Sequence, residues 1–336
     1  MIRRILMLTV LCWLLFGCQA ARADDCSASA TDIVFGTVSP IAGSDYYASG
    51  SVTVTCYWNL AGGALLGSSA VVLPNVAVCI NVGIGSPSAG GARAMGYGGT
   101  SLSYELYRDS TYAPGAVWGG GPGMPSSAGS VNTGFAALLA LSVQTTTVPM
   151  YARIPASALS GIAPTATGAS YTASFAGSAT ISYNFSTLVA FTCNGGKTSS
   201  FNFQVKANVI NDCQIGANNL SFGNQGLLNG GATGSTTLNV KCSANTAYQV
   251  VLGGGLVGNL LGGRKMKNGA TGETVSYRIT RSPNGLVWGD GTNATDILSG
   301  VGTGAVQSVN VYGSVPKQTT PSPGSYSDRV TATIIF

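Results

Sequence analysis

The chain has 336 residues, 48 of them glycine, a formal net charge of +5 and no histidine. So small a net charge does not favour a nucleic-acid-binding surface. The absence of histidine removes the most common general base and a common zinc ligand, and no carboxylate pair stands in a clear catalytic motif. We therefore predict a protein that is not an enzyme, binds no metal, needs no cofactor and has no nucleic-acid partner.

Residues 1–23 are predicted to be a signal peptide. Arg3 and Arg4 precede an apolar run that ends at Phe16, and Ala21-Arg22-Ala23 matches the cleavage pattern of such peptides, so the mature chain would begin at Asp24. A lipoprotein signal at Cys18 is the alternative, which the bulky Phe16 fits poorly. No other segment is apolar and long enough to span a bilayer. We expect an exported protein.

The rest of the sequence repeats itself. Cys26 and Cys213 are each followed nine residues later by Phe-Gly, and each has a second cysteine after the next alternating stretch. The match continues through Val-Trp-Gly at Trp118 and Trp288. A match of this length indicates a duplicated domain. We therefore expect repeat 1 at residues 24–185, a linker at 186–212 and repeat 2 at 213–336.

Both repeats have the pattern of β-sandwiches. Short segments rich in Thr, Val and Tyr alternate with Gly, Pro, Asn and Ser turns, and no long stretch has helical periodicity. The predicted fold class is all-β, with two immunoglobulin-like β-sandwich domains in tandem. The segments expected to be strands are Thr53–Cys56, Tyr104–Tyr107, Ala179–Phe185, Leu238–Cys242, Val275–Ile279, Val306–Tyr312 and Arg329–Phe336.

Six cysteines remain in the mature chain. An even number in an oxidising compartment favours disulfides over metal sites, although six cysteines allow 15 pairings. If the repeats share a fold, Cys26 pairs with Cys56 and Cys213 with Cys242. Elimination then leaves Cys79 with Cys193.

Repeat 1 has apolar segments that repeat 2 lacks. Loops of a sandwich cluster at its ends, and a contiguous exposed apolar patch usually marks an interaction site. Burial in the core is the alternative for each residue, and Trp118, which aligns with Trp288, is expected there. The candidate surface-binding residues are Tyr57, Trp58, Leu60, Leu65, Leu66, Tyr112, Val117, Leu138 and Leu139.

Residues 201–211 have the pattern of a donor strand, which completes a sandwich that lacks its last strand. Apolar and polar residues alternate there, so one face would carry Phe201, Phe203, Val205, Ala207 and Val209. Only Asp24 and Asp25 precede Cys26 in the predicted mature chain, whereas this strand could fill repeat 1 from within the chain. Repeat 2 would end at Phe336 with its groove open. An ordinary first strand of repeat 2, or a linker strand, is the alternative.

The sequence resembles the spore coat protein U family. The motifs that carry the resemblance are Cys213-x8-Phe222-Gly223, residues 287–291 and the terminal residues 324–336, and it is weaker but continuous over 26–185. That family supplies the subunits of archaic chaperone-usher pili, and a two-domain member resembles their tip adhesin. The resemblance implies a periplasmic chaperone, an outer-membrane usher and an adjacent pilin subunit that donates its N-terminal strand to repeat 2. It also implies export through the periplasm to the pilus tip at the cell surface.

We therefore expect attachment to hydrophobic or abiotic surfaces, and biofilm formation, through the apolar loops of repeat 1. One alternative is a glycan-binding adhesin in which Tyr46, Tyr47, Trp58 and Tyr97 stack on sugar rings. The other is a structural coat or envelope subunit whose apolar loops are buried between copies.

Overall fold

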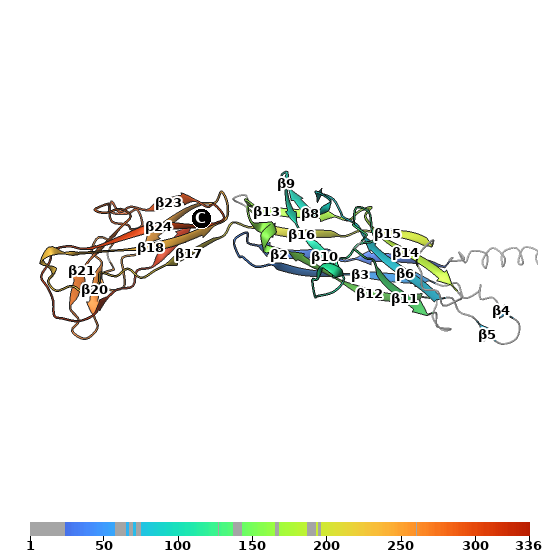
Figure 1. The fold of residues 1–336 in the computed structure, drawn as a ribbon, viewed down its shortest axis with the longest axis horizontal. Helices are drawn as coiled ribbons and strands as arrows, with labels where there is room; N and C mark the ends of the chain where they lie inside the picture. Colours follow the sequence, from blue (N-terminus) through green and yellow to red (C-terminus); the bar gives the residue numbers. More distant parts are fainter. Residues whose placement is uncertain are drawn as a thin grey trace, which may run out of the picture. The chain divides into compact units, whose positions relative to one another are not determined.

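The computed structural model describes residues 24–57, 65–66, 70–71, 75–126, 128–136, 143–164, 168–186, 193, 196–259 and 261–336 (Figure 1). The predicted signal peptide lies outside these residues. The chain forms two compact units. Unit 1 comprises Met1–Val34, Tyr47–Arg153 and Thr172–Lys206, and unit 2 comprises Phe35–Tyr46, Ile154–Tyr171 and Ala207–Phe336. Within the described residues, no helix has the length and apolar character needed to cross a bilayer.

Repeat 1 and the linker build three main sheets. The first has the strand order β1 (Asp25–Ala30), β3 (Tyr46–Tyr57), β12 (Val143–Ile154) and β10 (Glu105–Tyr107). The second has the order β11 (Val131–Ala136), β6 (Asn75–Val82), β14 (Ala179–Ser186) and β15 (Lys197–Phe201). The third has the order β2 (Ile33–Val38), β16 (Gln204–Val209), β13 (Ala169–Ser174), β8 (Ala92–Tyr97) and β7 (Ser88–Ala89).

Smaller elements complete this part of the chain. Strand β9 (Thr100–Ser103) pairs with β8, and β4 (Leu65–Leu66) pairs with β5 (Ala70–Val71). Among the described residues of this part, the helices are single turns, η2 (Pro114–Ala116) and α2 (Ala156–Leu159).

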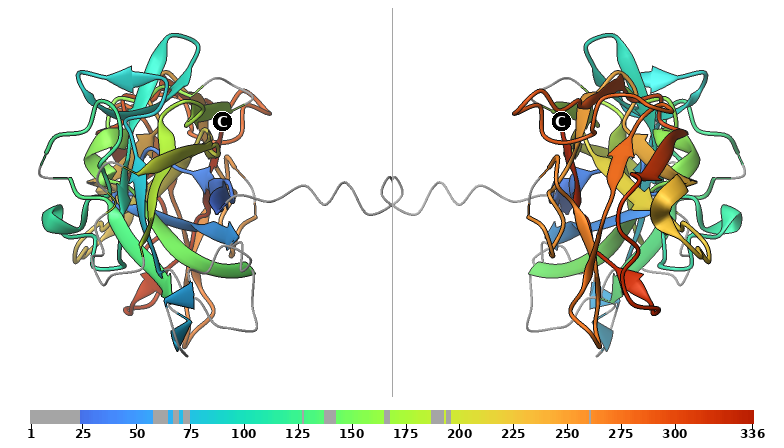
Figure 2. Two further views of the ribbon diagram at one scale, coloured as in Figure 1. Left: turned by 90° about the vertical axis from the view of Figure 1, so that its right-hand side faces the viewer. Right: turned by 90° about the vertical axis from the view of Figure 1, so that its left-hand side faces the viewer.

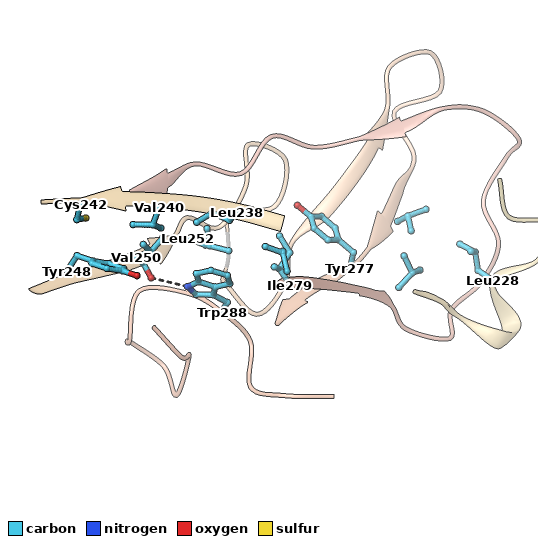
Figure 3. Packing of buried hydrophobic residues seen from close by; sticks show 13 residues of the cluster. Leu228, Leu238, Val240, Cys242, Tyr248, Val250, Leu252, Tyr277, Ile279 and Trp288 are labelled. Carbon is cyan, nitrogen blue, oxygen red and sulfur yellow. Dashed lines mark hydrogen bonds between the residues drawn. The ribbon is translucent and has the colours of Figure 1, made fainter. Parts of the chain in front are cut away.

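Repeat 2 also builds three sheets. The first has the strand order β17 (Cys213–Ala217), β18 (Ala232–Cys242), β24 (Val306–Val315) and β22 (Arg278–Thr280). The second has the order β23 (Leu298–Val301), β19 (Ala247–Leu252) and β26 (Ala332–Ile335). The third has the order β21 (Thr274–Ser276), β20 (Lys265–Asn268) and β25 (Tyr326–Ser327). The short helix η3 (Leu228–Gly230) precedes β18. The side chains between these sheets form one apolar core, in which Trp288 lies next to Val250 and Leu252 (Figure 3).

The same polar framework holds both cores. The Trp118 indole Nε1 donates to the carbonyl of Ile80 at 3.0 Å, and the Trp288 Nε1 donates to that of Val250 at 2.9 Å. Buried Arg93 donates to the Trp118 carbonyl at 2.8 Å. Buried Arg264 does the same to the Trp288 carbonyl at 2.7 Å. Trp118 thus belongs to the core, and the repeat in the sequence is a repeat in structure.

Three disulfides are present. Cys26–Cys56 joins directly opposite residues of β1 and β3, and Cys213–Cys242 does the same for β17 and β18. The third bond, Cys79–Cys193, joins β6 to the linker. Each repeat therefore has its first strand fixed to its neighbour, and the linker is fixed to repeat 1.

The prediction of an all-β chain is confirmed, with two local differences in repeat 2. The strand expected at Val275–Ile279 divides at Tyr277, whose N–H donates to the Arg264 carbonyl, and its halves β21 and β22 join different sheets. The strand expected at Arg329–Phe336 shortens to β26. The chain changes sheets at both places, which local periodicity cannot reveal.

We expect Trp118→Phe and Trp288→Phe each to destabilise its own repeat by about 2–4 kcal/mol. Each change leaves a buried carbonyl without its donor and opens a small cavity. Thermal unfolding of the full-length chain measures the effect, with Tyr47→Phe at an exposed position as the control. A loss no larger than the control's would contradict this role of the two indoles.

Candidate functional site

The linker contributes a strand to each of two sheets of repeat 1. Residues Lys197–Phe201 form β15, which pairs with β14 in antiparallel register, Ala179 opposite Phe201. The chain then crosses at 202–203 and continues as β16, which lies between β2 and β13. This differs from the single strand expected at 201–211, because Phe201 and Val209 serve different sheets.

The alternating face of this segment is the buried one. All five apolar residues named from the sequence lie in the core: Phe201, Phe203, Val205, Ala207 and Val209. The Phe203 ring stacks on that of Phe175, with centroids 4.3 Å apart and an interplanar angle of 6°. The polar side chains of Asn202, Gln204 and Asn208 are exposed. The linker therefore supplies core side chains to repeat 1.

Hydrogen bonds hold β16 on both sides. The Phe175 N–H donates to the Phe203 carbonyl at 3.1 Å, and the Ile210 N–H donates to the Val38 carbonyl at 3.1 Å. The Asp32 carboxylate accepts from the Gln204 N–H and from the Lys206 ammonium, both at 2.8 Å. The Lys206 ammonium and the Gln204 N–H lower the pKa of Asp32. Since residue 32 lies beside 204 and residue 38 beside 210, β16 runs in the same direction as β2.

Repeat 2 has an open groove at the corresponding place. Residues 217–220 and 222, of which 220 and 222 match positions of β2 in the repeat, form one wall, and residues 326–330 form the other. Leu238, Leu252 and Ile279 contribute to the floor of this cavity of about 550 Å³. Strand β26 ends its sheet, whereas its counterpart β14 is followed by β15. Among the described residues of repeat 2, no strand occupies the place that β16 takes in repeat 1.

Matching residues on one wall show what the groove lacks. Ile33 and Phe35 of repeat 1 are buried, whereas Leu220 and Phe222, at the same distances from the first cysteine, are half-buried. Repeat 1 has β16 beside these residues, whereas repeat 2 has no strand there among its described residues.

The other wall shows the same difference. Thr172 pairs with Gly96 in repeat 1, and Ser327 pairs with Lys267 in repeat 2. Gly96 and Lys267 each lie three residues after the buried arginine of their repeat, so Thr172 and Ser327 are equivalent positions. By the same alignment, Tyr171 matches Tyr326 and Phe175 matches Val330. Tyr171 and Phe175 are buried, whereas Tyr326 and Val330 are half-buried.

A carboxylate stands on the wall of the open groove. Asp328, where repeat 1 has Ala173, accepts a hydrogen bond from the Tyr277 hydroxyl at 2.7 Å and one from the Leu256 N–H at 3.0 Å. Burial and this carboxylate raise the pKa of the Tyr277 hydroxyl. Asp328 thus connects the wall to Tyr277, which also lines the groove.

Two apolar segments of repeat 1 leave the sandwich at the same end. In the sheet that contains β6, Asn75 lies between Ala136 of β11 on one side and Ser186 of β14 on the other. In the first sheet, bonds between Thr55 and Thr145 and between Thr53 and Thr147 bring Val143 to the level of Tyr57. Segments 58–74 and 137–142 therefore begin and end at this loop end, defined by Tyr57, Asn75, Ala136 and Val143. Both segments lack charged residues.

The side chains of six predicted surface-binding residues lie outside the described part of the structure: Trp58, Leu60, Leu65, Leu66, Leu138 and Leu139. Tyr57 is half-buried at the loop end, where it lies opposite Asp25. Tyr112 and Val117 lie elsewhere. The Tyr112 ring packs on that of Tyr47 at 4.6 Å, and Val117 bridges to Tyr107. Tyr47 and Tyr57 are ten residues apart on β3, which separates them by about 30 Å at ~3.3 Å per residue.

A tyrosine cluster around Tyr112 is a feature that the sequence analysis missed. The ring of Tyr112 also meets those of Tyr107 and Tyr151, at 5.3 and 6.3 Å. Tyr112 has a φ of 54°, in the left-handed region that bulky residues rarely adopt. The three partners lie on β3, β10 and β12, so only the sheet order brings them together. Across the part of the chain that the structure describes, no three acidic or cysteine side chains are grouped as metal ligands.

Comparison with known proteins finds one family matching two parts of the chain. A family model described as "Spore Coat Protein U domain" matches residues 13–175 and 199–333. Protein U of Myxococcus xanthus is 32% identical over 165 residues, which span 44% of this chain and 91% of that protein. The fold resembles that of the CsuC–CsuE chaperone–tip adhesion subunit pre-assembly complex from archaic chaperone-usher Csu pili of Acinetobacter baumannii. The TM-score is 0.51 and the sequence identity is 17%, and the match covers 93% of this chain and 100% of the matched chain in that complex.

We expect Val205→Asp to destabilise repeat 1 by more than about 3 kcal/mol, because it places a carboxylate in an apolar core. Lys206→Ala on the same strand should cost less than about 1 kcal/mol, because it removes only an exposed ion pair. Thermal unfolding and limited proteolysis of the full-length chain distinguish the two variants. Equal stability of the two would show that the linker strand does not complete repeat 1.

Proposed function

The chain belongs to the spore coat protein U domain family, and on that premise we propose that it is the tip adhesin of an archaic chaperone-usher pilus. The observation that carries this proposal is the difference between the two grooves. Repeat 1 is complete because the linker fills it, whereas repeat 2 keeps an apolar groove with the same walls. A chain in which one domain accepts a strand and the other domain needs no further strand is suited to the end of a fibre.

The groove of repeat 2 would receive the N-terminal strand of the adjacent pilin subunit. Backbone pairing along the walls supplies affinity, and alternate apolar side chains fill the floor. The linker in repeat 1 indicates the path: a first part pairs with the edge strand, as β15 does with β14, and a second part enters the groove, as β16 does. Before assembly, a periplasmic chaperone would cover the same apolar surface, since an open edge promotes aggregation. An outer-membrane usher would then pass the chain to the cell surface.

Adhesion would reside at the loop end of repeat 1. The support is that two uncharged segments containing Trp58, Leu65 and Leu138 begin and end there. Each Leu- or Trp-sized side chain that is fully desolvated on contact contributes roughly 1.5–3 kcal/mol. Many pili acting together multiply such weak binding. This mechanism suits attachment to hydrophobic or abiotic surfaces and biofilm formation.

For the acceptor role, we expect Val330→Asp to remove the chain from assembled pili, because it puts a carboxylate on the apolar groove wall. Val306→Asp, at a position 60% exposed on β24, is the matched control and should be incorporated normally. Immunoblots of sheared pili and of the periplasmic fraction provide the measurement. Normal incorporation of Val330→Asp would rule out strand acceptance in this groove.

For the adhesive role, we expect polar replacement of Trp58, Leu60, Leu65 and Leu66 together to abolish attachment of piliated cells to polystyrene while pili still assemble. Tyr112→Ser, about 30 Å from the loop end by the spacing along β3, should leave attachment unchanged. Counting attached cells and pili checks both. Unchanged attachment with normal pili would exclude the 58–74 segment as the adhesive surface.

A further inference from the structure

Repeat 1 has a second surface feature, a hollow beside the hairpin formed by β8 and β9. It has a volume of about 610 Å³ and is lined by residues 86–89, 96–101, 172–174 and 204. The hairpin is the teal element at the upper edge of repeat 1 in Figure 1, and it lies among the teal elements at the top of both views in Figure 2. The volume lies within the ~300–1,000 Å³ typical of small-molecule sites.

The hollow lies where the hairpin meets β13. Strands β8 and β13 pair at Gly96 and Thr172. The Pro87 ring lies against Gly96, where a Cβ atom would be only 2.7 Å from the proline Cγ. Strand β8 also pairs with β9 from Ala94 to Tyr97, with Tyr97 opposite Thr100. The hollow lies between the turn of this hairpin and residues 172–174 of β13.

Tyr97 lies beside a tight turn at the edge of this hollow. Gly98 and Gly99 have φ values of 53° and 82°, which fits the two positive φ values of a tight hairpin turn. The Thr100 hydroxyl donates to the Tyr97 carbonyl at 2.6 Å. The Tyr97 side chain is 39% exposed. The ring is therefore placed at the edge of the hollow and is accessible to a ligand.

The lining residues are neutral and rich in hydrogen-bonding groups. None is charged, and they include the hydroxyls of Ser88, Ser101 and Thr172 and the amide of Gln204. Hydroxyls and amides can each donate and accept hydrogen bonds. A sugar ring presents hydroxyls at its rim and apolar C–H groups on its faces, which matches a neutral polar lining with one aromatic ring.

The backbone of β13 beside the hollow is already paired on both sides, which argues against a peptide strand that adds to β13. A peptide strand binds by pairing with a free sheet edge. Here Ser174 exchanges both backbone hydrogen bonds with Ser86, at 2.8 and 2.9 Å, and Thr172 pairs with Gly96. On its other side, β13 pairs with β16. The hollow therefore offers side chains to a ligand, with no free edge of β13.

We propose that this hollow binds a segment of a neutral oligosaccharide, with the Tyr97 ring against one sugar face and Ser101, Thr172 and Gln204 bonded to its hydroxyls. This site is separate from the apolar loops and does not depend on them. It would add selectivity for polysaccharide-coated surfaces to the attachment described above.

The test uses the purified full-length chain and fluorescently labelled hexaoses of glucose (β1,4 and α1,4), mannose, xylose and N-acetylglucosamine, followed by fluorescence polarisation. We expect saturable binding of at least one of them. Tyr97→Ala should weaken it about tenfold through loss of the ring contact. Thr172→Arg, at an exposed position, should abolish it by filling the hollow. Tyr47→Ala, at a tyrosine 54% exposed outside the hollow, should have no effect.

Three results would overturn the proposal: no binding of any hexaose, unchanged binding in both Tyr97→Ala and Thr172→Arg, or capture of an extended Ser/Thr-rich peptide at this hollow instead of a sugar. Thermal unfolding shows whether the variants keep the native fold. Pilus assembly and attachment to polystyrene are scored separately. Normal assembly and attachment without sugar binding would therefore refute this site and leave the proposed tip adhesin role intact.

Discussion

The structure depends on one constraint, the apolar seam left when an immunoglobulin-like sandwich lacks a strand. In repeat 1, β16 covers the seam and buries Ile33 and Phe175 beneath Phe203 and its neighbours. In repeat 2 the same seam is open, and Leu220 and Val330 are half-exposed. Apolar burial contributes about 25 cal/mol per Å², so an open seam favours covering by another strand. The same geometry therefore stabilises one repeat and creates a binding site in the other.

Polar contacts inside repeat 2 connect its core and one wall of the open groove. Arg264 donates to the carbonyls of Gly253 and Trp288, which ties the loop after β19 to the tryptophan. Asp328 links the outer wall to Tyr277 on the floor. Repeat 1 uses Arg93 in the same way and adds an ion pair with Glu105 at 2.5 Å, where repeat 2 has Arg278. Contacts that hold a groove wall in place reduce the ordering cost of strand binding.

The sandwich of repeat 1 keeps its surfaces apart. Strand β3 extends from Tyr47, in the tyrosine cluster, to Tyr57 at the loop end. The β8–β9 hairpin, with Tyr97, belongs to another sheet. The tyrosines grouped in the glycan-binding alternative thus do not form one site, and the hollow beside Tyr97 must be considered by itself. Cys79–Cys193 fixes the linker to β6, and so keeps the strand that fills the seam within reach of repeat 1.

The all-β class, the duplication and the family resemblance followed from the sequence and are confirmed, because alternation, repeated motifs and cysteine spacing are local properties of the chain. The alternation at 201–209 likewise identified the five residues that the structure buries. Periodicity assigns residues to faces, but it does not say which sheet receives them. Only the tertiary structure divided that segment between β15 and β16, placed Tyr112 with Tyr47 and far from Tyr57, and opened the hollow beside Tyr97. Each of these results depends on strands distant in sequence becoming neighbours in a sheet, and such pairing is set by the packing of the whole domain.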